Sequence, residues 1–228
     1  MGNYYIAAEP KRRSKLVVVP FEQAAAVIQD GDLLLFQKQD LVGHLISRFG
    51  ASYYTHVGVA AWENGHVGTT PELMIYDISI LRGGSATLLR AHAKFWPGCI
   101  DVYRVSPYHT VIHWDPDDEC LKERRYTFDG HVAVSVMRKF CAPGVYGWWS
   151  AFRLGLSRMP LLSLLTQPPT DDEIESGYPP SCSHAVSYAV RKAFTDMVHG
   201  TPDMLTHPGD IARSPLTHYL FTLGAPTK

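Results

Sequence analysis

The chain has 228 residues, of which 46% are hydrophobic and 19% charged, and its formal net charge is −1. This balance is typical of a globular protein with a proper core, and it argues against a basic surface for nucleic acid and against a long charged tail. The sequence has no run of 18 apolar residues, so we expect no transmembrane helix. Its basic beginning has no apolar segment followed by a cleavage site, so we expect no standard secretory signal, and the compartment stays open.

The four cysteines of the chain argue against a zinc ribbon, because no two of them form a C-x-x-C pair. A chain of this length does not need disulfides, so we expect four free thiols. An acidic cluster within residues 115–119 favours a solvated surface over a metal site. We therefore expect no metal and no organic cofactor.

Residues 1–15 are polar and basic and predict a loose arm. Helical spacing of apolar residues predicts helices over residues 21–30 and 41–49. Apolar, β-branched or alternating runs predict strands at residues 33–37, 55–62, 73–78 and 100–105, with residues 16–20 either a short strand or an extended lead-in.

The connections in this half are marked by turn residues. Asn64-Gly65 is the strongest hairpin signal in the chain, and Gly83-Gly84 predicts a further turn. After the hairpin, residues 66–69 are an alternative to residues 73–78 for the next strand, and Pro71 favours the latter. Residues 86–94 are either a short helix or irregular.

The second half begins with residues 106–125, which we interpret as a polar connection. Residues 129–141 predict a helix with Val132, Val136 and Phe140 on its apolar side. An aromatic turn then leads into a helix near residue 150, and residues 160–180 predict a long surface loop or lid. A helix from residue 182 to 194, a short helical turn and an extended segment complete the chain.

Cys182 is the first candidate for chemistry. It follows Pro179, Pro180 and Ser181, and it stands at the start of the predicted helix, where Ser181 is a suitable N-cap. The positive end of a helix dipole favours a thiolate. A nucleophilic cysteine would be placed there, although a free cysteine is more often a small buried hydrophobic residue.

A thiolate nucleophile needs an imidazole within hydrogen-bonding reach and a group that orients the imidazole. His56 lies on a predicted strand among small residues, and Asp77 lies on the strand expected beside it. A buried carboxylate needs a partner, and orienting His56 would provide one. His66 is a second candidate for the base.

The order of these segments resembles the circularly permuted NlpC-type papain-like hydrolases. In that branch the histidine strand precedes the cysteine helix. The likeness covers roughly residues 30–220, with aspartate at 77 and histidine at 184 where relatives usually carry glutamate. The motifs that carry it are Gly31-Asp32, His56-Val57-Gly58, Asp77, Asp101-Val102-Tyr103-Arg104, Gly144-Val145-Tyr146-Gly147-Trp148, Cys182-Ser183, Thr201-Pro202 and Asp210-Ile211-Ala212-Arg213-Ser214-Pro215.

The resemblance implies an α+β, permuted papain-like fold in one domain spanning residues 1–228. A central antiparallel sheet or partial barrel would pack against helices, with the nucleophile at a helix N-terminus. It implies a Cys182–His56–Asp77 cysteine amidase or peptidase. For substrate or oxyanion binding we expect Tyr54, Tyr146, Trp148 and Tyr178.

The expected substrate is a peptide or amide bond of bacterial cell-wall peptidoglycan. The absence of a signal fits a phage particle, a lysis protein or an injected effector, with virion or delivery machinery as partners. Two alternatives stay open. One is a lipid or acyl thioester hydrolase or acyltransferase, with residues 160–180 over an acyl groove. The other is a non-catalytic structural or virion component with the same fold.

Overall fold

A computed structural model describes residues 17–37, 52–64, 70–79, 82–115, 118–141, 180–199 and 201–224. The expected arm at residues 1–15, the helix at 41–49, the aromatic segment after residue 141 and nearly all of the predicted lid lie outside these residues. So do His66 and three of the expected substrate-binding residues, Tyr146, Trp148 and Tyr178.

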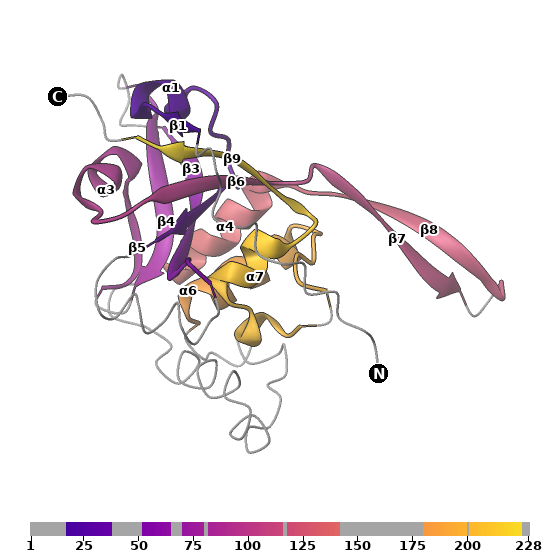
Figure 1. Ribbon diagram of the computed structural model, residues 1–228. Helices are drawn as coiled ribbons and strands as arrows, with labels where there is room; N and C mark the ends of the chain where they lie inside the picture. Colours follow the sequence, from indigo (N-terminus) through magenta and orange to yellow (C-terminus); the bar gives the residue numbers. More distant parts are fainter. Residues whose placement is uncertain are drawn as a thin grey trace, which may run out of the picture.

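Seven strands form an open sheet in the order β1-β9-β6-β2-β3-β4-β5 (Figure 1). Neighbouring strands are antiparallel except β1 and β9, which are parallel. The prediction of an α+β fold with a central sheet is confirmed. Because the sheet does not close, the alternative of a partial barrel does not form. The strands are β1 (Val18–Val19), β2 (Leu33–Phe36), β3 (His56–Glu63), β4 (Glu72–Ser79), β5 (Gly83–Leu88), β6 (Ile100–Val105) and β9 (Thr217–Leu223).

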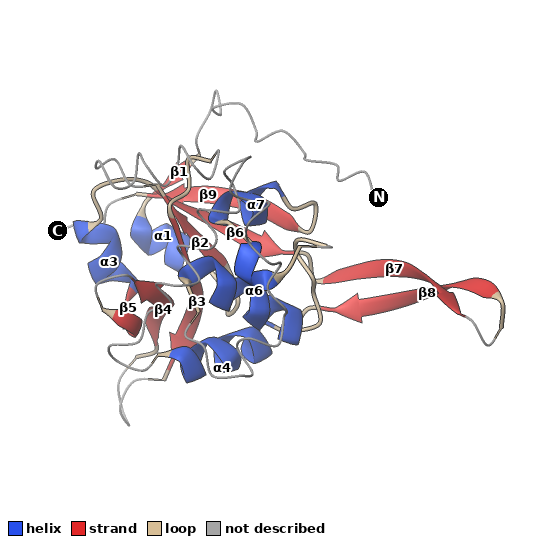
Figure 2. Cartoon of the chain, turned by 90° about the horizontal axis from the view of Figure 1, so that it is seen from below, coloured by secondary structure: helices blue, strands red, loops and turns tan. Residues whose placement is uncertain are grey.

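Helices cover both faces of this sheet (Figure 2). The helices α4, α6 and α7 pack on one face, and α1 and α3 pack on the other. The central strand β2 is therefore buried on both sides, which explains its unbroken apolar sequence. The helical segments are α1 (Phe21–Ala25), α3 (Leu89–Phe95), α4 (Gly130–Phe140), α6 (Cys182–Lys192), the 3₁₀ turn η3 (Asp203–Leu205) and α7 (Pro208–Arg213).

The helix predicted over residues 129–141 forms as α4, and Asp129 caps it. Its carboxylate accepts from the backbone N–H groups of His131 and Val132 at 2.9 and 3.2 Å. The buried side of α4 is centred on Ala133, Val134 and Met137, one position away from the side that the sequence pattern favoured.

Two predicted irregular segments are regular, and one predicted helix is shorter. The connection at residues 106–125 contains a hairpin of β7 (Tyr108–Asp115) and β8 (Cys120–Thr127). Both of its faces meet solvent over much of their length, so the polar–apolar alternation of a half-buried strand is absent. The glycine pair at 83–84 starts β5 rather than forming the expected turn. The helix expected over residues 21–30 ends at Ala25.

The glycines of β5 allow a close approach of α4. Gly83 has a φ of 74°, which favours glycine, and a Cβ at Gly84 would overlap the backbone carbonyl of Phe140. The same residues that indicate a turn in the sequence here permit a strand to lie against a helix end. In the part of the chain that the structure describes, no helix is long and apolar enough to cross a bilayer.

Candidate active site

Cys182 is the first residue of α6 and its side chain is 8% exposed. Ser181 occupies the N-cap position in an extended conformation, and its carbonyl accepts from the Ala185 N–H at 3.0 Å. The Ser181 hydroxyl makes no capping bond, contrary to the expected role of that side chain. Because the first N–H groups of a helix have no carbonyl partner within it, the backbone around Cys182 is suited to hold negative charge.

His56 is the first residue of β3 and pairs with Phe36, the last residue of β2. Strand alternation places Val57 and Val59 on the sheet face that α6 covers, and His56 on the opposite face. The site therefore lies at the end of the sheet, where the start of α6 meets the beginning of β3.

Asp77 lies on β4, opposite Gly58 and beside the His56 strand. Its Oδ2 is 2.8 Å from His56 Nε2, and its Oδ1 accepts from the Ser85 hydroxyl at 2.7 Å. The carboxyl is 1% exposed and both of its oxygens are engaged, so its orientation is held from two sides. Since Nε2 faces Asp77, the Nδ1 nitrogen of His56 is the one left for the thiol.

The charges of Cys182 and His56 favour an ion pair. Burial opposes ionisation of Cys182, but the charge of His56, a hydrogen bond from it and the backbone N–H groups of Val57 and Ser183 together hold the thiol pKa below its usual value. Burial also opposes protonation of His56. The charge of Cys182, followed by the hydrogen bond to Asp77, outweighs it and raises the His56 pKa to about 10.

A comparison with Cys141 shows how much the lowered thiol pKa of Cys182 depends on the imidazole. It is partly buried at the end of α4, and its thiol donates to the carbonyls of Ser85 and Met137. Burial, assisted by the charge of Asp77, raises its pKa to about 11. Of these two shielded thiols, only the one beside His56 is shifted toward thiolate.

An aromatic group supports the His56 ring. Trp96 stacks on it with ring centres 6.3 Å apart, and Phe36 lies 5.3 Å away at a tilt. His92 in turn stacks on Trp96, with ring centres 5.5 Å apart. The His92 pKa is lowered, by burial first and also by the charge of His56, which disfavours its protonated form. The sequence pattern did not reveal Ser85, His92 or Trp96, because residues 86–94 have no decisive periodicity and Ser85 and Trp96 flank that segment.

Both hydrogen-bond donors of Tyr54, one of the residues expected to bind substrate or oxyanion, are engaged within the protein. Its hydroxyl donates to Asp101 at 2.7 Å and its N–H donates to the Ser52 hydroxyl at 3.0 Å, so neither donor is available to an oxyanion. Burial and the charge of Asp101 raise the pKa of Tyr54. Asp101 also accepts from Gln37 and Thr222. This buried group joins β6 and β9 to the residues just after β2 and just before β3, and so fixes the segment that leads into His56.

No group of three or more His, Cys, Asp or Glu side chains within the described residues is arranged to hold a metal. Cys99, Cys120, Cys141 and Cys182 are all free thiols. The acidic residues Asp118 and Glu119 lie exposed at the tip of the β7–β8 hairpin.

Neither a protein-family model nor a curated protein matches the chain. Among the solved structures that do match is the crystal structure of the metalloprotein yiiX from Escherichia coli O157:H7, DUF1105. It is 12% identical, with a TM-score of 0.51, and the match covers 84% of this chain and 96% of that one. The likeness shows a shared fold. At this identity it carries no information on chemistry.

Proposed function

We propose that the protein is a cysteine hydrolase of the permuted papain-like type, acting through Cys182, His56 and Asp77. The observation that carries the proposal is the position of His56 between a buried carboxylate 2.8 Å away and a thiol whose pKa it lowers. Aspartate, imidazole and thiol in this order are the parts of an activated nucleophile.

The first half of the proposed reaction forms an acyl-enzyme. The Cys182 thiolate attacks the carbonyl carbon of an amide, and the C=O π electrons move to oxygen. The intermediate collapses as the C–N bond breaks, and protonated His56 gives its proton to the departing nitrogen. Asp77 keeps the ring oriented and stabilises its charge while the proton is held.

The second half restores the thiolate. Neutral His56 removes a proton from water, the hydroxide attacks the thioester, and the C–S bond breaks to release the carboxylic product. The oxyanion of each intermediate would lie beside the start of α6, where the Cys182 N–H is the first donor. Since both donors of Tyr54 are engaged, the second oxyanion donor must be another group.

The chain order supports the permuted assignment. His56 and Asp77 lie on strands that precede the Cys182 helix by more than a hundred residues, whereas standard papain-like enzymes place the cysteine first. From the resemblance, we propose that the substrate is the peptide or amide part of bacterial peptidoglycan. Delivery of the protein by a virion, lysis or secretion apparatus belongs to the same proposal.

The test is digestion of purified peptidoglycan, with the products identified by mass spectrometry. We expect wild type to release peptide or amine fragments, and Cys182→Ala and His56→Ala to release none above background. Cys120→Ala is the matched control, because this thiol is exposed on the hairpin and should leave activity unchanged.

The same variants should be incubated with a peptide amide, a phospholipid and an acyl thioester. Hydrolysis of the lipid or thioester alone would replace the amide proposal by acyl hydrolysis at the same residues. Full peptidoglycan cleavage by Cys182→Ala would refute the mechanism.

A further inference from the structure

The β7–β8 hairpin is a separate two-stranded sheet that extends away from the seven-stranded body (Figures 1 and 2). Its register runs from Tyr108 opposite Thr127 at the base to Asp115 opposite Cys120 near the tip. A two-stranded hairpin is only marginally stable in water when nothing packs on it. Packing of another surface against it would stabilise such an element.

One face of the hairpin carries exposed apolar side chains. Alternation along the strands and the pairing register place on this face Tyr108, Thr110, Ile112, Leu121, Glu123 and Arg125. Ile112 is 62% exposed and Leu121 is 69% exposed. We call this set the Ile112 face. Arg124 and Tyr126 lie on the opposite face.

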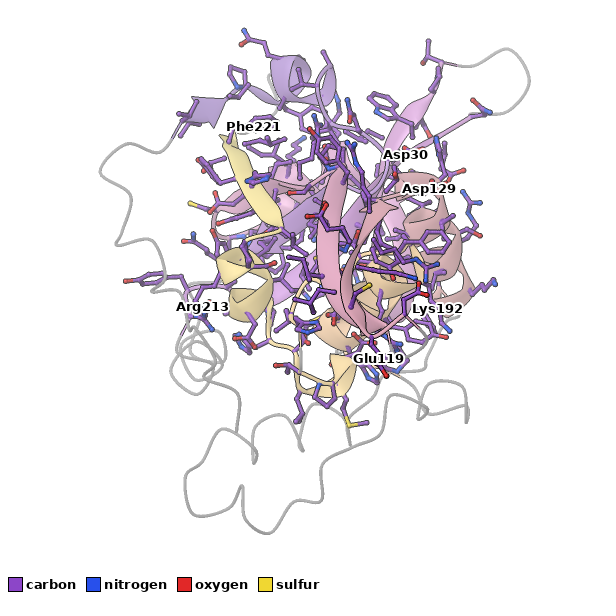
Figure 3. The ribbon with its side chains drawn as sticks, turned by 90° about the vertical axis from the view of Figure 1, so that its right-hand side faces the viewer. Asp30, Glu119, Asp129, Lys192, Arg213 and Phe221 are labelled. Carbon is purple, nitrogen blue, oxygen red and sulfur yellow. The ribbon has the colours of Figure 1, made fainter. Side chains whose placement is uncertain are left out.

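Charged side chains are unevenly distributed along the same element, with acids at the tip and arginines nearer the base; between them Lys122 forms an ion pair with Asp118 and Glu123 lies on the Ile112 face. Asp118 and Glu119 are exposed at the tip, and Figure 3 views the molecule from this side with Glu119 labelled. Arg124 and Arg125 lie nearer the body, over the rings of Tyr126 and Tyr108. Counted along the sequence, the acids at 118–119 and the bases at 124–125 lie equally far from a point between residues 121 and 122. This point is next to the exposed Leu121.

We propose that the Ile112 face pairs with the same face of a second copy of this chain, antiparallel, about a two-fold axis beside Leu121. In a two-fold interface each contact occurs twice, so a self-complementary surface is required. This axis places Ile112 and Leu121 against their counterparts. It also places Glu119 near Arg125 of the other copy, and Arg125 near its Glu119.

The tip chemistry favours this partner over a lipid surface. An apolar tip that enters an anionic bilayer is normally flanked by basic residues, because the headgroups are negative. Here Asp118 and Glu119 are next to the exposed apolar residues. A basic partner surface suits the tip, and Arg125 on a second hairpin supplies one.

The first test is sedimentation equilibrium at low salt. We expect a wild-type dimer whose dissociation constant rises with salt. Arg125→Glu and Glu119→Lys should each weaken the dimer by about tenfold or more, because attraction becomes repulsion at two symmetric sites. Arg125→Glu combined with Glu119→Lys should restore most of the affinity. Arg124→Glu makes the same charge change on the opposite face and should change the dissociation constant by no more than about threefold.

The second test is crosslinking in a Cys120→Ser background. A bis-maleimide that spans the roughly 10 Å between packed sheets should join two copies of Leu121→Cys, which lies beside the axis. Thr127→Cys is the control, since Thr127 is exposed and its pairing with Tyr108 places it on the same side of the hairpin, but its two copies would be roughly 35 Å apart. It should not crosslink above the Cys120→Ser background.

Three outcomes would overturn the proposal. The first is a wild-type monomer at low salt and high concentration. The second is a dimer that Arg125→Glu and Arg124→Glu weaken equally. The third is monomeric protein that binds anionic vesicles through Leu121. Hydrolysis by Cys182 is measured separately, so failure of this proposal leaves the proposed reaction untouched.

Discussion

At the scale of single residues, the chemistry depends on one imidazole between two buried groups. His56 lies between two groups whose negative charge raises its pKa, the Cys182 thiolate and the Asp77 carboxylate. Each partner makes the protonated ring more favourable, and the protonated ring makes the thiolate more favourable. The ion pair is therefore a property of the three residues together.

This coupling predicts the pH dependence of both labelling and turnover. Alkylation of Cys182 by iodoacetamide should stay fast well below the ordinary thiol pKa of about 8.5. Hydrolysis should fall as pH rises through about 10, where His56 loses the proton that the leaving group needs. His56→Ala should move the midpoint of Cys182 alkylation to higher pH. Peptide mass spectrometry gives the rate, with Cys120 in the same sample as an internal reference.

Substitutions of Asp77 and Ser85 should differ in how far they lower kcat. Asp77→Asn removes the charge that supports protonated His56, so kcat should fall on the order of 10²–10⁴-fold and the alkaline limb should move to lower pH. Ser85→Ala removes one hydrogen bond to Asp77 and should lower kcat about 2–10-fold. Ala86→Ser, exposed on the same strand, is the control. An unchanged alkaline limb in Asp77→Asn would contradict the assigned role.

At the scale of elements, α6 must be held in place if Cys182 is to face His56. Nine consecutive residues at its start are buried. The Asp203 carboxylate in η3 holds the second half of α6. It accepts from the Ser187 hydroxyl and from Arg191 Nε, both at 2.7 Å. Asp203 is itself buried, so these bonds are made away from water.

Asp203→Ala should lower the free energy of unfolding by about 2–5 kcal/mol, because Ser187 and Arg191 lose a buried acceptor. Urea denaturation measures this change. Asp196→Ala is a matched control on a neighbouring turn, where the carboxylate is 40% exposed and pairs with the exposed His199. It should cost less than about 1 kcal/mol. Equal losses in the two variants would show that Asp203 does not hold α6.

At the scale of the whole molecule, the body and the hairpin have separate tasks. The proposed reaction uses the end of the seven-stranded sheet and the start of α6. The hairpin forms its own sheet, and its base is closed by the Phe128 N–H, which donates to the Pro107 carbonyl at 3.0 Å. The two ends of the hairpin are thus adjacent in the body.

Replacement of residues 108–127 by Asn-Gly should therefore leave the body folded, since this pair closes a tight turn. We expect alkylation of Cys182 and peptidoglycan cleavage to stay within about twofold of wild type, because no group of the triad lies in the hairpin. Loss of Cys182 alkylation together with a lower midpoint of thermal unfolding would show instead that the hairpin supports the body.

The sequence by itself determined the elements whose signals are local. The strands expected at residues 33–37 and 55–62 and the helix expected at 129–141 follow from side-chain periodicity, which depends on near neighbours in the chain. Cys182 at a helix start and Asp77 on the strand beside His56 were predicted in the same way. The family likeness that relates this order of segments to a permuted papain-like enzyme stays a proposal.

Only the tertiary structure decided which groups meet. Ser85 reaches Asp77 through the register of β4 and β5, and Trp96 reaches His56 from a segment with no clear pattern. The Tyr54 hydroxyl donates its hydrogen bond to Asp101, 47 residues away, and is therefore not available as an oxyanion donor. The physical reason is that hydrogen-bond partners and strand neighbours are set by long-range pairing. The periodicity of a local segment does not predict that pairing.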